Sequence, residues 1–267
     1  MTAAPPSPHP SLPRRPLTVG ELLDAAVQLL RGRSGLWLLV VAAGLAIAEQ
    51  GGLFLLRGYM GISPTDDFWD TFGLQMLILM LGVASEAMII NMLGPMAGRR
   101  AAIAVGITPP KRVAWERTLV TAPVVGFTNL AGLMLGPFWI LGYGLFGVSG
   151  ASIGLENRGA FAALGRGARL AFRGGMRVTW VRLLGYFSWL LLRLAFFAGL
   201  GSLMSLLAFG SDTDYWIGIA GSALINTATY AYLAALDACA LVESRFRSEA
   251  WDIRLNREAL PALKAVR

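Results

Sequence analysis

Five ionisable residues lie inside stretches of the chain that are otherwise apolar, namely Glu49, Glu86, Arg182, Arg193 and Asp237. A charged side chain among apolar groups needs an opposite charge, a hydrogen-bond partner or water, because its desolvation is costly. Such residues either pair and fix the register of neighbouring helices, or line a path on which Glu49 and Glu86 take up protons or contact a cation. The sequence leaves both interpretations open.

Other residues that could do chemistry are scarce. The only histidine is His9 and the only cysteine is Cys239. Metal centres need clusters of His, Cys, Asp or Glu, and nucleophilic catalysis needs a base beside a Ser or Cys. We therefore expect no catalytic residue, no metal site and no cofactor, and a protein that is not an enzyme.

The five charges must be positioned by a membrane bundle. Hydrophobic residues make up 55% of the chain and charged residues 15%, whereas a soluble domain has roughly 25% charged residues. A transmembrane helix needs about 20 apolar residues. Segments near this length occur at residues 36–56, 72–97, 119–135, 138–155, 178–207 and 215–242. The predicted fold is all-α, a polytopic membrane bundle of six transmembrane helices. The short, glycine-rich segment 137–155 also allows a re-entrant or half-crossing helix.

Lysine and arginine residues are sorted between the two ends of these segments. All 23 except Arg57, Arg182 and Arg193 fall between alternate segments, whereas the opposite loops carry aspartates. By the positive-inside rule this places both termini in the cytoplasm, with outer loops near residues 57–71 and 208–214. The net charge of +7 is explained by arginines that contact anionic lipid headgroups, and nucleic acid is not an expected partner.

The two ends of the chain differ from the bundle. Residues 1–17 hold six of the 13 prolines and are expected to form a disordered cytoplasmic tail. Residues 18–247 form the predicted transmembrane domain, and residues 248–267 form a cytoplasmic C-terminal tail. Thr18 and Glu21 have the spacing of a capping box, which starts an amphipathic helix.

Two amphipathic segments, residues 18–33 and 158–174, are predicted to lie along the inner membrane face. Arg166, Arg169 and Arg173 share one helical face of the second segment. We expect these arginines to face the lipid headgroups. In the competing interpretation, the segment simply extends the fifth transmembrane helix into the cytoplasm.

Counting residues from the segment ends predicts which buried charges meet. At 1.5 Å per residue, Glu49 and Arg193 lie about 20 Å and about 22 Å from the inner face and are expected to pair. Glu86 lies about 9 Å and Arg182 about 6 Å from that face. This predicts a second pair, unless Asp237 near the inner end of the sixth helix competes for Arg182.

Some uncharged residues are predicted to hold the helices together. Gly150 and Gly154 have the small-xxx-small spacing that lets two helices approach closely. Asn91 lies in an apolar segment, where an amide is expected to form a hydrogen bond to another helix.

Three motifs resemble a known family. They are the opening RRPLTVGELLDAAVQLLRGR, the segment LENRGAFAALGRGARLAFRGGMRVTWVRLL and the ending ESRFRSEAWD, in which Glu243 and Ala250 replace the family's Asp and Gly. They are similar to motifs of the bacterial family named for the glycerophosphoryl diester phosphodiesterase membrane domain, and the resemblance covers residues 14–252. It implies a multi-pass protein of the bacterial cytoplasmic membrane. The family's name comes from relatives fused to a separate catalytic domain, and neither that domain nor its activity is expected here.

Two functions remain from the sequence. The first is a non-catalytic scaffold, assembly factor or accessory subunit, whose partner is another membrane protein or a second copy of the chain; it is favoured by the interfacial helices and by the lack of an energy-coupling motif. The second is a small transporter or permease-like subunit that uses intramembrane carboxylates. A cavity that reaches Glu49 or Glu86 would favour transport, and sealed ion pairs would favour a scaffold.

Overall fold

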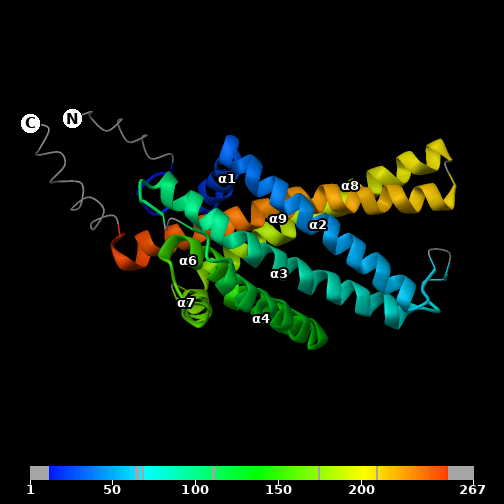
Figure 1. Cartoon of the computed structure of the whole chain (residues 1–267), viewed down its shortest axis with the longest axis horizontal. Helices are drawn as coiled ribbons and strands as arrows, with labels where there is room; N and C mark the ends of the chain where they lie inside the picture. The colour runs from blue at the N-terminus through cyan, green and yellow to red at the C-terminus, as the bar shows by residue number, and fades with distance from the viewer. Residues whose placement is uncertain are drawn as a thin grey trace, which may run out of the picture.

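The computed structural model describes residues 12–251 except 64, 65, 68, 110, 111, 174 and 209. Regular structure in this part of the chain is helical throughout, as predicted (Figure 1). The helices are α1 (Val19–Leu30), α2 (Arg33–Tyr59), α3 (Phe72–Ala104), α4 (Trp115–Met134), the 3-10 helix η1 (Gly136–Phe138), α5 (Trp139–Phe146), α6 (Ser149–Glu156), α7 (Ala160–Phe172), α8 (Arg177–Leu207) and α9 (Ser211–Glu249).

Four helices are long and apolar enough to cross a membrane, among those described: α2, α3, α8 and α9. They form the long body of the molecule (Figure 1). Large apolar side chains on their outer surfaces, such as Leu55, Leu191 and Leu206, are between 67% and 81% exposed. Hydrocarbon, rather than water, is the solvent that favours such a surface. These features support a membrane protein with transmembrane helices.

The third and fourth apolar segments form a shorter hairpin. α4 has 20 residues, but a single helix over residues 138–155 is a wrong expectation, because the chain forms η1 and the eight-residue helices α5 and α6. Trp139 of α5 packs on Phe187 of α8, with ring centroids 6.0 Å apart. Beyond Phe187, α8 continues for about 30 Å at 1.5 Å per residue. The tip of the hairpin therefore ends well short of the far end of α8 (Figure 1).

Glycines allow α6 to lie backbone to backbone on α3. A Cβ atom on Gly150 would lie 2.2 Å from the carbonyl oxygen of Asn91, and one on Gly154 would lie 2.1 Å from a carbonyl oxygen of α3. Asn91 Nδ2 donates a hydrogen bond to Ser149 Oγ (2.7 Å), and Asn91 Oδ1 accepts one from Thr121 of α4 (2.9 Å). The close approach at both glycines and the interhelical role of Asn91 are confirmed.

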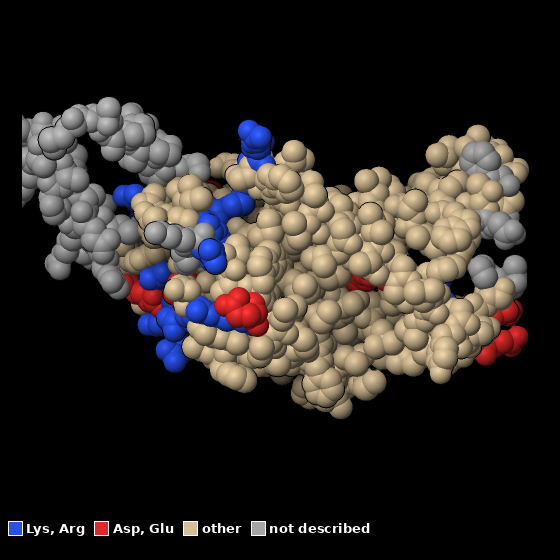
Figure 2. All heavy atoms as spheres, viewed as in Figure 1, with Lys and Arg blue, Asp and Glu red and all other residues tan. Residues whose placement is uncertain are grey.

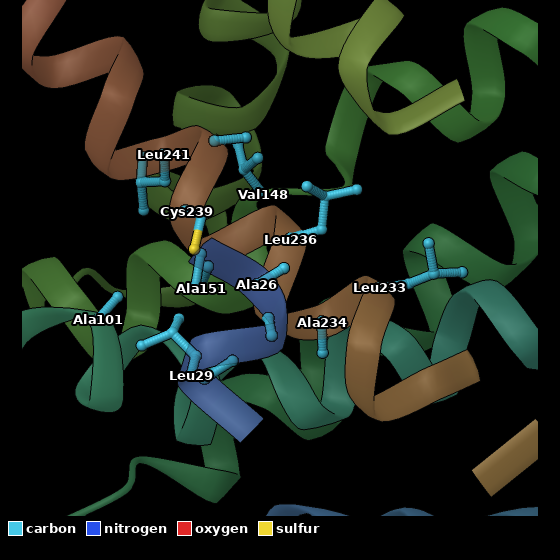
Figure 3. Packing of buried hydrophobic residues seen from close by; sticks show 14 of the residues in the cluster. Ala26, Leu29, Ala101, Val148, Ala151, Leu233, Ala234, Leu236, Cys239 and Leu241 are labelled. Carbon is cyan, nitrogen blue, oxygen red and sulfur yellow. The ribbon is translucent and has the colours of Figure 1, made fainter. Parts of the chain in front are cut away.

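α1 packs against α9 through its apolar face. The capping box is present, since Thr18 Oγ1 accepts from the Glu21 amide and the Glu21 carboxylate accepts from the Thr18 amide. Ala26 and Leu29 of α1 lie in the same cluster as Ala234 of α9 (Figure 3). The predicted amphipathic helix is therefore present, and its apolar stripe contacts the bundle.

The residues before α1 run along the C-terminal end of α3. The Leu12 amide donates to the carbonyl oxygen of Ala104 (3.1 Å), and Arg14 Nε donates to the next carbonyl oxygen (3.0 Å). Leu12 is buried. The expected disordered tail is therefore wrong for residues 12–17, while residues 1–11 lie outside the described residues.

The bundle also extends past its predicted C-terminal boundary at residue 247. α9 continues to Glu249, and Trp251 is buried beside Phe246. Arg245 Cζ lies 3.7 Å from the centroid of the Trp251 ring. Most of the expected C-terminal tail, residues 252–267, lies outside the described residues.

α7 is a helix separate from α8. The chain turns sharply between them, where Gly175 and Met176 have φ values of 71° and 62°. Residues 158–174 therefore do not extend the fifth transmembrane helix. The face of α7 that packs on its neighbours contains Ala163, Leu164, Arg166, Gly167, Leu170 and Ala171.

Candidate functional site

Four helices each place a polar or charged side chain in the middle of the bundle. Glu86 of α3 pairs with Arg193 of α8 through the guanidinium Nη2, and the hydroxyl of Tyr186, also on α8, donates to Glu86 Oε2 (3.1 Å). Tyr230 of α9 lies beside Arg193, whose Cζ is 5.7 Å from the tyrosine ring centroid. Glu49 of α2 lies in the same cluster.

Glu49 is held by hydroxyl groups rather than by a cation. Ser85 Oγ donates to Glu49 Oε1 (2.5 Å), and the Tyr230 hydroxyl donates to Glu49 Oε2. No ion pair to Glu49 occurs among the described residues, so the expected pair with Arg193 is wrong. Arg193 pairs with Glu86 instead. The depth estimate failed because α3 and α8 have 33 and 31 residues, well beyond the roughly 20 that span the core.

A second ion pair joins α8 to α9 near the N-terminal end of α8. Arg182 Nε donates to Asp237 Oδ1 (2.6 Å) and Arg182 Nη2 to Oδ2 (3.3 Å), while Nη1 donates to the carbonyl oxygen of Tyr143. A Cβ on Gly147 would lie 1.6 Å from Arg182 Cζ, so only glycine fits there. Arg182 thus pairs with Asp237, as the alternative prediction allowed, and its expected pairing with Glu86 is wrong.

The two ion pairs differ in whether they are buried in protein or border a cavity. The side chains of Arg182 and Asp237 are at most 4% exposed. Glu49, Glu86 and Arg193 line a cavity of about 310 Å³ between α2, α3, α8 and α9. Figure 2 shows acidic atoms in a recess midway along the apolar surface. The pair of Arg182 and Asp237 is thus buried in protein, whereas the central cluster of Glu49, Glu86 and Arg193 borders a cavity.

A second cavity continues from the central one toward the start of α9. It has a volume of about 330 Å³ and reaches Asp214 at the start of α9. Asp214 Oδ1 is buried and has no hydrogen-bond partner among the described residues. The two cavities share the lining residues Gln50, Leu53, Arg57, Phe197 and Ser222. The two cavities therefore adjoin, and together, as the passage, they extend from Asp214 to Glu49 and Glu86.

Carboxylates outnumber arginines along this passage. Glu49, Glu86 and Asp214 line it, against Arg57 and Arg193. The combined lining therefore has an excess of one carboxylate when all five groups are charged. Arg193 already pairs with Glu86, and Arg57, near the end of α2, lines both cavities. Low-dielectric walls strengthen the field of such an excess and attract cations.

A separate network of charges joins α6, α7 and the C-terminal end of α9. Arg166 is buried, with Nη2 3.0 Å from Glu156 Oε1 and Nη1 2.5 Å from Glu249 Oε1. The expectation that Arg166 faces lipid is therefore wrong, because α7 turns this residue toward α6 and α9. Arg169 and Arg173 are exposed, as expected for that role.

No group of three or more His, Cys, Asp or Glu residues suited to a metal ion occurs among the described residues. Cys239 is buried in the apolar core (Figure 3), and His9 lies outside the described residues. The chemistry of the central site is thus hydrogen bonding and charge.

Sequence reasoning missed the hydroxyl groups that complete the central cluster, namely those of Ser85, Tyr186 and Tyr230. A signal for two of them exists, since Tyr186 precedes Arg193 by seven residues and Tyr230 precedes Asp237 by seven. This spacing of two helical turns places each tyrosine on the same face as a buried charge.

No family model, no curated protein and no solved structure matches the chain. Its function is therefore proposed from the residues and their arrangement.

Proposed function

We propose that the chain is a non-catalytic membrane protein that binds a small cationic solute in the passage above Glu49 and Glu86, as a small transporter or permease-like subunit. The observation that carries this proposal is the cavity that reaches Glu49, a carboxylate held by two hydroxyl donors and by no arginine. The cavity of about 310 Å³ is at the lower end of the range for small-molecule sites.

The buried pair of Arg182 and Asp237 shows how this chain builds a structural ion pair. There the charges match one to one, and Tyr143 and Gly147 close the site around them. In the central cluster an additional carboxylate faces a cavity instead. Leaving a carboxylate without a cation at this depth is costly, so an ammonium group, a metal cation or a proton is the natural occupant.

For the topology, we propose that both termini are cytoplasmic in a bacterial cytoplasmic membrane. The proposal rests on the charges, since basic side chains gather at the end that carries α1 and α7, and acidic ones lie on the loop between α2 and α3 at the other end (Figure 2). α2, α3, α8 and α9 cross fully, while α4 to α6 form a re-entrant hairpin in place of two of the six predicted crossings. α1 and α7 lie along the inner face. External labelling of an Arg169→Cys variant would contradict this orientation.

The second candidate is a scaffold or accessory subunit with a membrane-protein partner or a second copy of the chain. The network of Arg166, Glu156 and Glu249 favours it, because these largely buried ion pairs hold α6, α7 and α9 together in a rigid unit. The resemblance to the glycerophosphoryl diester phosphodiesterase membrane-domain family is compatible with either candidate and implies no catalysis.

Charge-selective modification of an engineered thiol tests the main proposal. The background variant is Cys239→Ala, which removes the only native thiol. Ser222→Cys, in the wall shared by both cavities, is treated in proteoliposomes with a trimethylammonium or a sulfonate methanethiosulfonate reagent. We expect the cationic reagent to react at least roughly tenfold faster, after correction for the reagents' rates with a free thiol, which corresponds to about 1.4 kcal/mol.

Two further variants control this experiment. Leu191→Cys, on the outer surface of α8, should react with neither reagent because it faces lipid. Glu49→Gln in the Ser222→Cys background should reduce the preference for the cationic reagent. If Ser222→Cys reacts with neither reagent, the cavity is sealed and the scaffold is the better candidate. Faster reaction with the sulfonate reagent would exclude a cationic solute.

A further inference from the structure

Three arginines surround a cavity at the inner end of the bundle. It has a volume of about 240 Å³, lies between the start of α8 and the end of α9, and is lined by Arg173, Arg177, Val178, Glu243, Ser244, Arg247 and Ser248. The central passage is lined by different residues, so the two sites are distinct.

Glu243 orients two of these arginines but neutralises only one charge. Its Oε1 accepts from Arg177 Nε (3.3 Å) and Arg247 Nε (2.7 Å). Arg177 Nη2 also donates to the Leu17 carbonyl oxygen (2.9 Å), and Arg173 Nη2 donates to that of Ser248 (3.2 Å). Arg173 Nη1 lies 3.8 Å from Oε1 of Glu249, which pairs more closely with Arg166 and does not line the cavity. Within the described part of the chain, no hydrogen bond uses Arg177 Nη1 or either Nη of Arg247. The cavity thus has positive charge and free N–H donors.

An apolar groove adjoins this basic cavity. It has a volume of about 340 Å³ and is lined by Val19, Gly175, Arg177, Trp180, Val181 and Leu184. Trp180 is 62% and Leu184 47% exposed, on the first turns of α8 next to the basic end. Arg177 lines both the groove and the basic cavity, so a single ligand with a charged part and an apolar part can occupy both.

We infer that these adjoining cavities bind one anionic phospholipid of the inner leaflet. Its phosphate lies among Arg173, Arg177 and Arg247, because planar guanidinium groups suit phosphate oxygens. One acyl chain runs along Trp180 and Leu184. Phospholipid, rather than free phosphate, fits because the basic cavity opens beside an apolar groove that water would solvate poorly.

Binding at this site is distinct from the general attraction of a basic surface to an anionic membrane, because it involves only some of the arginines at this end of the bundle. Arg166 is more deeply buried and is engaged by two carboxylates, so it takes no part. Arg169 is exposed on the same helix but does not line either cavity. Arg169 therefore provides a matched control with the same charge at a similar depth.

Native mass spectrometry of the full chain, released from detergent with added phosphatidylglycerol or phosphatidylcholine, tests the inference. We expect one phosphatidylglycerol molecule to bind in preference to phosphatidylcholine. Arg173→Gln and Arg247→Gln should each weaken phosphatidylglycerol binding roughly fivefold, since a basic side chain near an anionic surface contributes about 1 kcal/mol. Arg169→Gln should leave binding unchanged.

Further measurements separate the sources of the phosphate and detect unfolding. Trp180→Ala should weaken phosphatidylglycerol binding, and millimolar inorganic phosphate should not displace the lipid. Full displacement by inorganic phosphate, together with no effect of Trp180→Ala, would show a free-anion site and overturn the lipid assignment. Equal losses for Arg169→Gln and Arg247→Gln would show non-specific attraction. Circular dichroism of each variant excludes loss of helical structure as the cause of weaker binding.

Discussion

Breaking the pair of Arg193 and Glu86 should destabilise the bundle more than removing both charges. The pair joins α8 to α3, and the side chains are only 13% and 5% exposed. Arg193→Leu alone leaves the Glu86 carboxylate with Tyr186 as its hydrogen-bond donor and no cation. The loss of one partner of a buried pair typically costs about 3–5 kcal/mol.

The two charges set the size of the expected coupling. Unit charges roughly 4 Å apart attract by about 4 kcal/mol at an effective dielectric constant of about 20. The cavity beside the pair admits water, and partly unfolded chains in a membrane find other partners. Both effects reduce the attraction, so we expect a coupling energy of about 1–3 kcal/mol between Glu86→Gln and Arg193→Leu.

Unfolding in mixed micelles with increasing dodecyl sulfate, followed by tryptophan fluorescence, gives the free energies of the wild type, both single variants and the double variant. These four proteins form a double-mutant cycle, and a matched control cycle combines Glu49→Gln with Arg193→Leu. Because Glu49 has no ion pair among the described residues, its coupling to Arg193 should be smaller than that of Glu86. The pairing of Arg193 with Glu86 would be refuted by two results together. The free-energy changes of Glu86→Gln and Arg193→Leu would add to within about 0.5 kcal/mol, and those of Glu49→Gln and Arg193→Leu would be strongly coupled.

Three further predictions concern other parts of the molecule. Leu135→Cys, at the tip of the hairpin of α4 and α5 that we propose to be re-entrant, should resist an impermeant maleimide from either side, whereas a full crossing would expose it to external reagent. Hydrogen bonds from Arg15 and Thr18 lower the pKa of Glu21 from 4.5 to about 2. Its stabilisation of α1 is therefore complete above about pH 4.5 and is lost as the pH falls through about 2, so the difference in Tm between wild type and Glu21→Gln should disappear in strong acid. Gly150→Ala should lower the unfolding free energy by about 1–3 kcal/mol because its Cβ meets the α3 backbone, and no change of that size would contradict the close packing.

Hydropathy predicts the long helices of this chain because a transmembrane helix is specified by its own composition. α2, α3, α8 and α9 all fall on predicted segments, and the capping box of Thr18 and Glu21 is a local pattern that needs no tertiary information. The break between α5 and α6 was not predicted, since Gly147 and Val148 continue an apolar run. The chain bends there around the Arg182 side chain, which arrives from α8.

The partners of the buried charges depend on distances that sequence does not contain. The sequence offers the pair of Arg182 and Asp237 as one of two alternatives because both residues lie near the ends of their apolar segments, where counting errors are small. Glu49 and Glu86 lie mid-helix, and a tilt or an extra turn changes which of them meets Arg193. Arg166 has the same spacing pattern as exposed arginines of α7, and only the fold brings Glu249 to it.

The pairing of Arg182 with Asp237 has a consequence for biosynthesis. Ribosomes produce α8 before α9, so the Arg182 guanidinium emerges well before the carboxylate that neutralises it. Inserting α8 alone would leave an uncompensated guanidinium in the bilayer. A short connection links the two helices, which favours their entry into the lipid as one helical hairpin with the charges already matched. A nascent chain halted before residue 237 should accordingly be a substrate for quality-control proteolysis, and one extended past it should be retained.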